Sequence, residues 1–112
     1  MSLYYSPEKY GLATVGEIDW SDGCYQFDYT VIWRNHDGQL FHADDSGCSC
    51  PSPFESTGLD DLTACTLPEL QAYLEKRLDE EFPPSETDEW YGSGWAERAA
   101  KIVDLISRAR AR

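Results

Sequence analysis

Strict alternation of side-chain polarity from residue 25 to residue 33 constrains the fold more than any other feature of this chain. The odd positions are apolar or aromatic and the even positions are mostly polar. The odd set is Tyr25, Phe27, Tyr29, Val31 and Trp33. A period of two sustained over this stretch predicts a β-strand with one buried face. We therefore expect a sheet built around this strand.

A turn signal follows the strand. Residues 35–38 read Asn-His-Asp-Gly, which suits a type I turn closed by a glycine in the left-handed conformation, as in a hairpin with a bulge. This hairpin sets Trp33 opposite Phe41 and Val31 opposite Ala43. Because all four side chains then share the buried face, the pattern supports this register.

A weaker strand precedes the strong one. We expect Leu12, Ile18 and Trp20 on one of its faces, with Ala13 and Val15 on the other. Together the three segments predict an antiparallel meander of three strands. The expected strands cover about 12–20, 25–34 and 39–43.

The second half of the chain changes to a helical period. Thr66 and Glu69 form a capping-box pattern, with a threonine at the N-cap and a glutamate three residues later. Leucines then recur along one face, at Leu70, Leu74 and Leu78. This spacing predicts a helix over about 67–81.

A second helix is expected over about 94–110. Its apolar stripe consists of Trp95, Ala99, Ile102, Val103 and Ile106. Residues 82–93 begin with Phe-Pro-Pro and continue with mostly polar residues, so they predict a linker between the helices. Trp90 and Tyr91 are embedded in this linker.

Composition is typical of a folded protein with one domain. An apolar content of 41% with 13% aromatics exceeds that of disordered chains. We expect one α+β domain over 1–112, with two helices packed on the meander and an N-terminal segment over 1–10. No apolar run approaches the roughly 20 residues that cross a bilayer. Residues 1–10 also lack the pattern of a signal peptide, so a cytoplasmic location is expected.

Acidic charge is distributed unevenly. Residues 1–93 carry 19 acidic and 4 basic residues, residues 94–112 carry 2 acidic and 5 basic residues, and the net charge is -12. A body this acidic repels phosphate backbones, which disfavours direct binding of nucleic acid. It suits a partner protein with a basic surface. A purely solubilising role for the acids is the alternative.

The cysteines raise two further alternatives. They are Cys24, Cys48, Cys50 and Cys65. In a reducing cytoplasm these four could hold a structural zinc ion, although the usual pair of C-x-x-C knuckles is missing. A thiol enzyme would need a base beside Cys48 or Cys50, and His42 is the only candidate. Buried thiols without a chemical role are the simplest interpretation.

Residues 44–55 are the least ordinary stretch, reading Asp-Asp-Ser-Gly-Cys-Ser-Cys-Pro-Ser-Pro-Phe-Glu. The prolines predict a stiff loop, which burial of Phe54 in the core would pin. The acids in and near this stretch lack the twelve-residue spacing of a calcium loop, so we interpret them as solvated surface. They are Asp44, Asp45, Glu55, Asp60 and Asp61.

The segment from Asp45 to Glu55 resembles the signature of a family of small uncharacterised proteins encoded by bacteriophages of actinobacteria and by some of their hosts. The similarity continues through residues 16–20, the strand over 25–33, the Asp37-Gly38 turn and residues 59–62. The resemblance implies a phage-associated cytoplasmic protein. It implies no particular activity, cofactor or catalytic residue.

These observations favour a non-enzymatic protein that binds a host protein in the host cytoplasm. Asp44 and Asp45 would supply acidic contacts, and Trp90 and Tyr91 would supply aromatic anchors. No cofactor, membrane or nucleic acid is expected as a partner. A zinc-binding structural module using the four cysteines is the alternative, and a thiol enzyme is the third interpretation.

Overall fold

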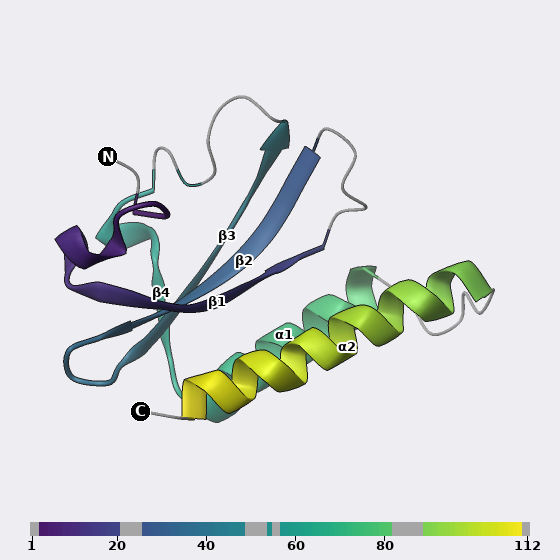
Figure 1. The fold of residues 1–112 in the computed structure, drawn as a ribbon. Helices are drawn as coiled ribbons and strands as arrows, with labels where there is room; N and C mark the ends of the chain where they lie inside the picture. The colour runs from purple at the N-terminus through teal and green to yellow at the C-terminus, as the bar shows by residue number, and fades with distance from the viewer. Residues whose placement is uncertain (1–2, 21–25, 49–53, 55–56, 82–88, 111–112) are drawn as a thin grey trace. The chain divides into compact units, whose positions relative to one another are not determined.

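The computed structural model describes residues 3–20, 26–48, 54, 57–81 and 89–110, without the side chains at 26–27, 48 and 89–95. The chain forms two compact units, residues 1–65 and residues 66–112. The first contains an antiparallel sheet and the second contains two helices (Figure 1). The α+β class is therefore confirmed. Packing of the helices on the sheet within one domain stays a prediction.

Within the described residues, four strands form the sheet in chain order, instead of the three that the sequence predicts. They are β1 (Leu12–Asp19), β2 (Gln26–Asn35), β3 (Leu40–Cys48) and β4 (Thr63–Cys65). β3 runs past its predicted end at residue 43, because its backbone keeps pairing with β2 although its side chains become polar. β4 has three residues, too few to show a period in the sequence.

The hairpin of β2 and β3 has the predicted register. Both expected pairs form, Trp33 with Phe41 and Val31 with Ala43. In the turn, the backbone amide of Asn35 donates to the carbonyl of Gln39 at 3.0 Å. Gly38 has a φ of 86°, the left-handed conformation that this turn requires of its glycine.

A β-bulge in β1 corrects the predicted faces of that strand. The pairing partners shift between Thr14 and Gly16, so Val15 is an extra residue in the ladder. One extra residue reverses the alternation for everything that follows it. Leu12 and Ile18 therefore lie on opposite faces of the sheet, and the prediction that they share one face is wrong.

We name the two faces of the sheet after neighbouring residues of β2, the Trp33 face and the Ile32 face. The Trp33 face carries a core cluster of Leu3, Leu12, Val31, Trp33, Ala43 and Phe54. Tyr29 and Phe41 were predicted in this core and are only partly buried against it. The side chain of Phe27, also predicted there, lies outside the described residues. Buried residues of the Ile32 face include Ile18, Thr30, Ile32, Leu40 and His42.

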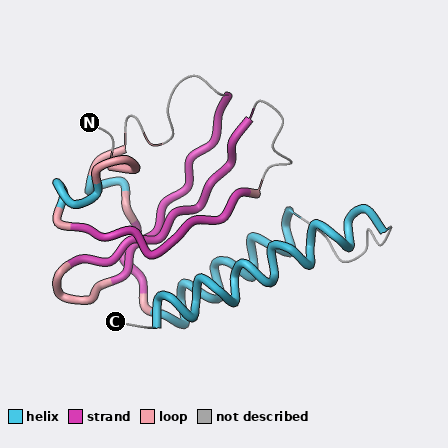
Figure 2. Tube along the Cα trace, in the orientation of Figure 1, coloured by secondary structure: helices cyan, strands magenta, loops and turns pink. Residues whose placement is uncertain are grey.

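The helical unit consists of α1 (Leu67–Glu81) and α2 (Glu89–Arg110), which lie side by side (Figure 2). α1 has the predicted bounds and buries its three predicted leucines. Its capping box is also confirmed: the Thr66 amide donates to Glu69 Oε1 at 2.8 Å, and the Glu69 amide donates to Thr66 Oγ1 at 3.3 Å. These bonds satisfy amides that the first helical turn leaves without partners.

α2 differs from its prediction in its start and in its buried stripe. It begins at Glu89, so the stretch from residue 89 to 93 is helix and not linker. Ile102 and Ile106 are buried as expected, together with Leu105 and Ala109. Val103 is 67% exposed, and its predicted place in the buried stripe is wrong. Within the described part of the chain, no helix is both long and apolar enough to cross a bilayer.

Candidate functional site

Tyrosines and carboxylates meet on the Trp33 face at one edge of the sheet. The hydroxyl of Tyr4 donates to both carboxylate oxygens of Glu17, at 3.0 Å and 2.8 Å. Asp19 pairs with Tyr29 across β1 and β2. We call the group made of Tyr4, Tyr5, Glu17, Asp19 and Tyr29 the tyrosine–carboxylate cluster.

The bulge in β1 determines which side chains enter this cluster. Beyond the bulge, Glu17 pairs with Val31 and Asp19 pairs with Tyr29, so both carboxylates project on the Trp33 face. Under the uninterrupted alternation that the sequence predicts, Ile18 would share that face with Leu12. The bulge therefore places charge beside the tyrosines and sends Ile18 to the other face.

Ring stacking holds the tyrosines of the N-terminal segment against the sheet. Tyr4 stacks on Tyr29 with ring centroids 6.1 Å apart and on Phe54 with centroids 5.7 Å apart. Tyr5 contacts Tyr4 edge to face at 4.9 Å and is 63% exposed. Such pairs stabilise by about 0.5–1.5 kcal/mol each beyond area burial. Tyr4 and Tyr29 are thus held in place by stacking, whereas the side chain of Tyr5 is exposed.

Burial and neighbouring acids favour the protonated hydroxyls of Tyr4 and Tyr29. Burial, followed by the hydrogen bond to Glu17, raises the pKa of Tyr4 well above its usual range. Burial, followed by the charges of Asp19 and Glu17, raises the pKa of Tyr29. The negative charge of the cluster therefore resides on the carboxylates, beside aromatic rings. Carboxylates near aromatic ring faces suit a lysine or arginine side chain, through ion pairing and cation–π contact.

Phe54 packs on the same face. Its side chain is buried, as predicted, and meets Trp33 edge to face at 5.5 Å. Its backbone amide donates to Asp45 Oδ2 at 2.7 Å. Asp45, proposed from the sequence as a contact for a partner, is therefore half-buried and holds the chain at Phe54.

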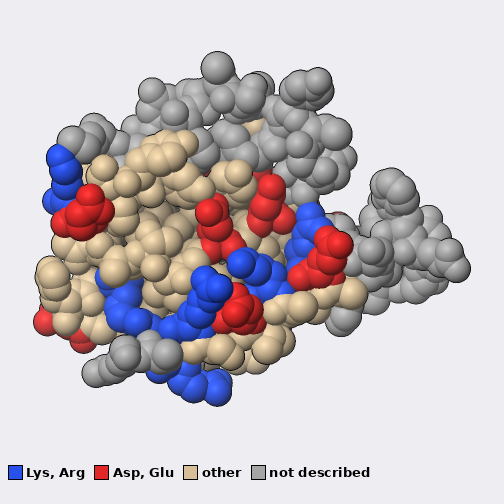
Figure 3. Space-filling model, viewed as in Figure 1, with Lys and Arg blue, Asp and Glu red and all other residues tan. Residues whose placement is uncertain are grey.

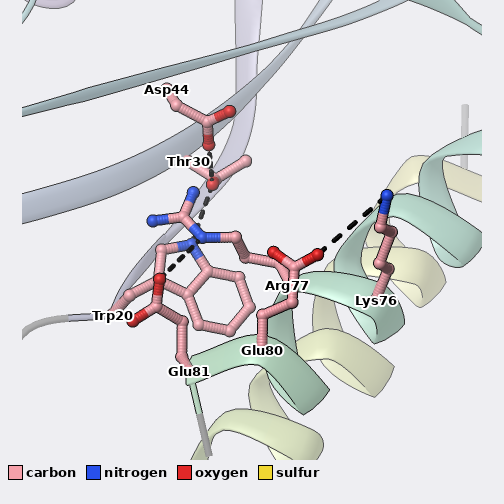
Figure 4. A network of polar contacts seen from close by, with 7 residues as sticks. All are labelled: Trp20, Thr30, Asp44, Lys76, Arg77, Glu80 and Glu81. Atoms are coloured by element: carbon pink, nitrogen blue, oxygen red, sulfur yellow. Dashed lines mark hydrogen bonds and ion pairs between the residues drawn. The ribbon is translucent and has the colours of Figure 1, made fainter.

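Asp44 lies on the Ile32 face and is exposed. It accepts a hydrogen bond from the hydroxyl of Thr30, which in turn accepts one from the indole nitrogen of Trp20 at 2.8 Å (Figure 4). The buried Trp20 and Thr30 thereby satisfy their polar atoms, as buried polar groups require. Asp44 thus has a structural contact and an exposed carboxylate.

The acidic charge belongs mainly to the sheet unit. Residues 1–65 carry 11 acidic residues and only two basic ones, Lys9 and Arg34. Residues 66–112 carry 10 acidic and 7 basic residues. Ion pairs along α1 include Lys76–Glu80 and Arg77–Glu81 (Figure 4). Arg108 pairs with Asp104 on α2. Acidic and basic side chains lie next to one another on the face in Figure 3, as these helical pairs require.

The sheet register separates the cysteines and histidine that the alternatives need. Cys65 is buried and pairs with Leu40 at one end of β3, whereas Cys48 ends that strand. Eight residues of strand span about 26 Å, and zinc ligands must lie about 2.3 Å from one ion. His42 is six residues, or about 20 Å, from Cys48. Cys24 and Cys50 lie outside the described residues.

Other predicted acids and aromatics are accounted for as follows. Asp61 accepts a hydrogen bond from the amide of Gly58 at 2.9 Å, a capping contact, and Asp60 is exposed. Glu55 lies outside the described residues. Trp90 and Tyr91 are in the first turn of α2, and their side chains are likewise not described. Among the described residues, no group of three or more His, Cys, Asp and Glu could hold a metal ion.

The tyrosine–carboxylate cluster was not predicted from the sequence, although one signal points to it. Gly16 lies inside an alternating pattern, and an isolated glycine in a strand suggests a bulge. Allowing for that bulge places Glu17 and Asp19 on the Trp33 face. The contact of Tyr4 with this face has no local signal, since it joins segments 13 residues apart.

The chain belongs to the family described as Domain of unknown function (DUF7574), whose model matches residues 1–111. This match indicates no catalytic family. No curated protein and no solved structure matches the chain.

Proposed function

We propose that the protein acts without catalysis, by binding the basic surface of a partner protein through the tyrosine–carboxylate cluster. One observation carries the proposal. The carboxylate of Glu17 accepts a hydrogen bond from Tyr4, and Asp19 pairs with Tyr29 across the strands, in a unit with 11 acidic and two basic residues. An unbalanced acidic surface of this kind speeds the encounter with a basic protein.

The cluster supplies what a lysine or arginine of the partner needs. Tyr5 is the exposed ring, and Glu17 and Asp19 supply the charge. A cation over an exposed ring gains about 0.5–1 kcal/mol, and about 2 kcal/mol or more when the contact excludes water. Because Tyr4 and Tyr29 are fixed by stacking, little further ordering is required on binding.

The partner is proposed to be a host protein, and the site of action the host cytoplasm. The resemblance to phage-encoded proteins supports this setting. The family match gives no function and says nothing about where the protein acts. Asp44, whose carboxylate is exposed, extends the acidic surface onto the Ile32 face. Asp45 is assigned a supporting role, since it holds Phe54. Trp90 and Tyr91 remain proposed aromatic anchors at the start of α2.

The test begins with affinity capture from an actinobacterial lysate and identification of the captured protein by mass spectrometry. Surface plasmon resonance with that purified protein then compares the native chain with the Glu17→Gln, Asp19→Asn double variant. Asp37→Asn with Asp60→Asn is the matched control, since both of these acids are exposed and lie outside the cluster. We expect the cluster variant to weaken binding about tenfold, or about 1.4 kcal/mol, and the control to change it little.

Salt and the aromatic anchors give independent readouts. Association of the native chain should slow steeply as salt rises, because screening acts over about 8–10 Å at moderate ionic strength. Trp90→Ala should chiefly speed dissociation. Equal weakening by the cluster variant and its control would contradict the role of the cluster. Capture of nucleic acid or membrane alone would contradict a protein partner.

A further inference from the structure

An apolar groove runs between α1 and α2 within the helical unit. Its volume is about 520 Å³. Its apolar lining consists of Leu78, Ala99, Ile102, Val103 and Ile106. Val103 lines this groove and leaves 67% of its surface exposed.

The two rims of the groove have opposite charge. Glu75 and Asp79 of α1 line one side, and Arg110 of α2 lines the other. The same contrast extends along the helices. α1 carries five acidic and two basic residues, and α2 carries three acidic and four basic residues.

We propose that this groove is the interface between two copies of the chain. A two-fold axis parallel to the helices would set α1 of each copy against α2 of the other, which gives a bundle of four helices. Glu75 and Asp79 of one copy would then face the basic rim of the other, and the contact would occur twice. Val103 would be covered at the centre of the interface.

Charge selects this occupant over other partners. A basic segment in the groove would meet Arg110, and an acidic segment would meet Glu75 and Asp79. A second copy satisfies both rims at once, because it presents the same two rims reversed. The helices are about 22 Å and 33 Å long, so the two copies could contact each other along the whole of α1. This inference does not depend on the proposed function.

The mass of the native protein in solution provides the first test, by analytical ultracentrifugation over a range of protein concentrations. We expect a dimer that dissociates on dilution. Val103→Glu should give a monomer at every concentration. Ala100→Glu is the matched control, since it adds the same charge to an exposed position of α2 outside the groove, and it should leave the dimer intact.

A charge exchange separates the interface from a loss of folding. Arg110→Glu should weaken the dimer at least about tenfold, and adding Glu75→Arg to it should restore most of the affinity. Circular dichroism would confirm that each variant keeps its helices. A native protein that is monomeric at all concentrations would overturn the proposal. A dimer unaffected by Val103→Glu and by the charge exchange would also overturn it.

Discussion

Phe54 combines complete burial with a φ of 58°, a backbone conformation that bulky residues rarely adopt. The left-handed region costs such a residue roughly 1–2 kcal/mol. Packing against Tyr4 and Trp33, together with the hydrogen bond from its amide to Asp45, offsets this cost. These contacts place Phe54 in the core of the sheet.

Truncation of the rings in this core should be severe. We expect Trp33→Ala and Phe54→Ala each to lower the free energy of unfolding by about 3–5 kcal/mol, because each removes a fully buried aromatic side chain. Phe41→Ala should cost less, since Phe41 is only partly buried. Chemical denaturation followed by tryptophan fluorescence and circular dichroism would measure the differences. An unchanged midpoint for Trp33→Ala would contradict the observed register.

At the scale of elements, local signals were reliable where neighbours in the chain determine the structure. The capping box and the leucine spacing of α1, and the turn that closes the hairpin of β2 and β3, all follow from such signals. The bulge at Val15 was missed because one extra residue has no hydrophobic signature. The early start of α2 and the exposure of Val103 were also missed, since a 3.6-residue period alone fixes neither where a helix begins nor which edge of its stripe is covered.

The capping box of α1 should make helix stability depend on acid. Hydrogen bonds from the amide and side chain of Thr66 lower the pKa of Glu69 below its ordinary value of 4.5. A pKa that is lower in the folded state gives stability that is present above the unfolded value and lost as pH falls through the folded value. Glu69→Gln should remove this acid dependence while keeping an acceptor for the Thr66 amide.

Thr66→Ala tests the other half of the box. We expect a loss of about 1 kcal/mol at neutral pH, because the amide of Glu69 then lacks its side-chain acceptor. Denaturation curves at neutral and acidic pH, followed by the helical circular dichroism signal, would measure both variants. An acid response of Glu69→Gln equal to that of the native protein would show that the box is not its source.

At the scale of the whole molecule, charge and core are distributed differently. The sheet unit has an aromatic core on its Trp33 face and most of the net negative charge. The helical unit has leucine and isoleucine contacts and nearly balanced charge. The net charge follows from composition alone. How much of that charge belongs to the sheet unit depends on where the chain divides into its two units. That division rests on contacts between residues far apart in the chain.

The apolar surface of the two units should suffice for folding without metal. We expect the cooperative thermal transition of the purified protein to be unchanged by a strong chelator under reducing conditions. Calorimetry with and without the chelator, and after zinc is added back, would measure this. Loss of the transition on chelation, with recovery on adding zinc, would instead support the zinc-binding module.

The bulge in β1 has a consequence for how the length of this chain can vary. β1 contains one residue more than regular pairing with β2 requires, since Thr14 and Gly16 have consecutive partners. A strand without Val15 would alternate regularly, and Leu12, Glu17 and Asp19 would still share the Trp33 face. A one-residue deletion here is therefore expected to preserve the cluster, whereas a deletion in β2 would exchange its faces. Family members that differ by a single residue in this sheet should differ at this position.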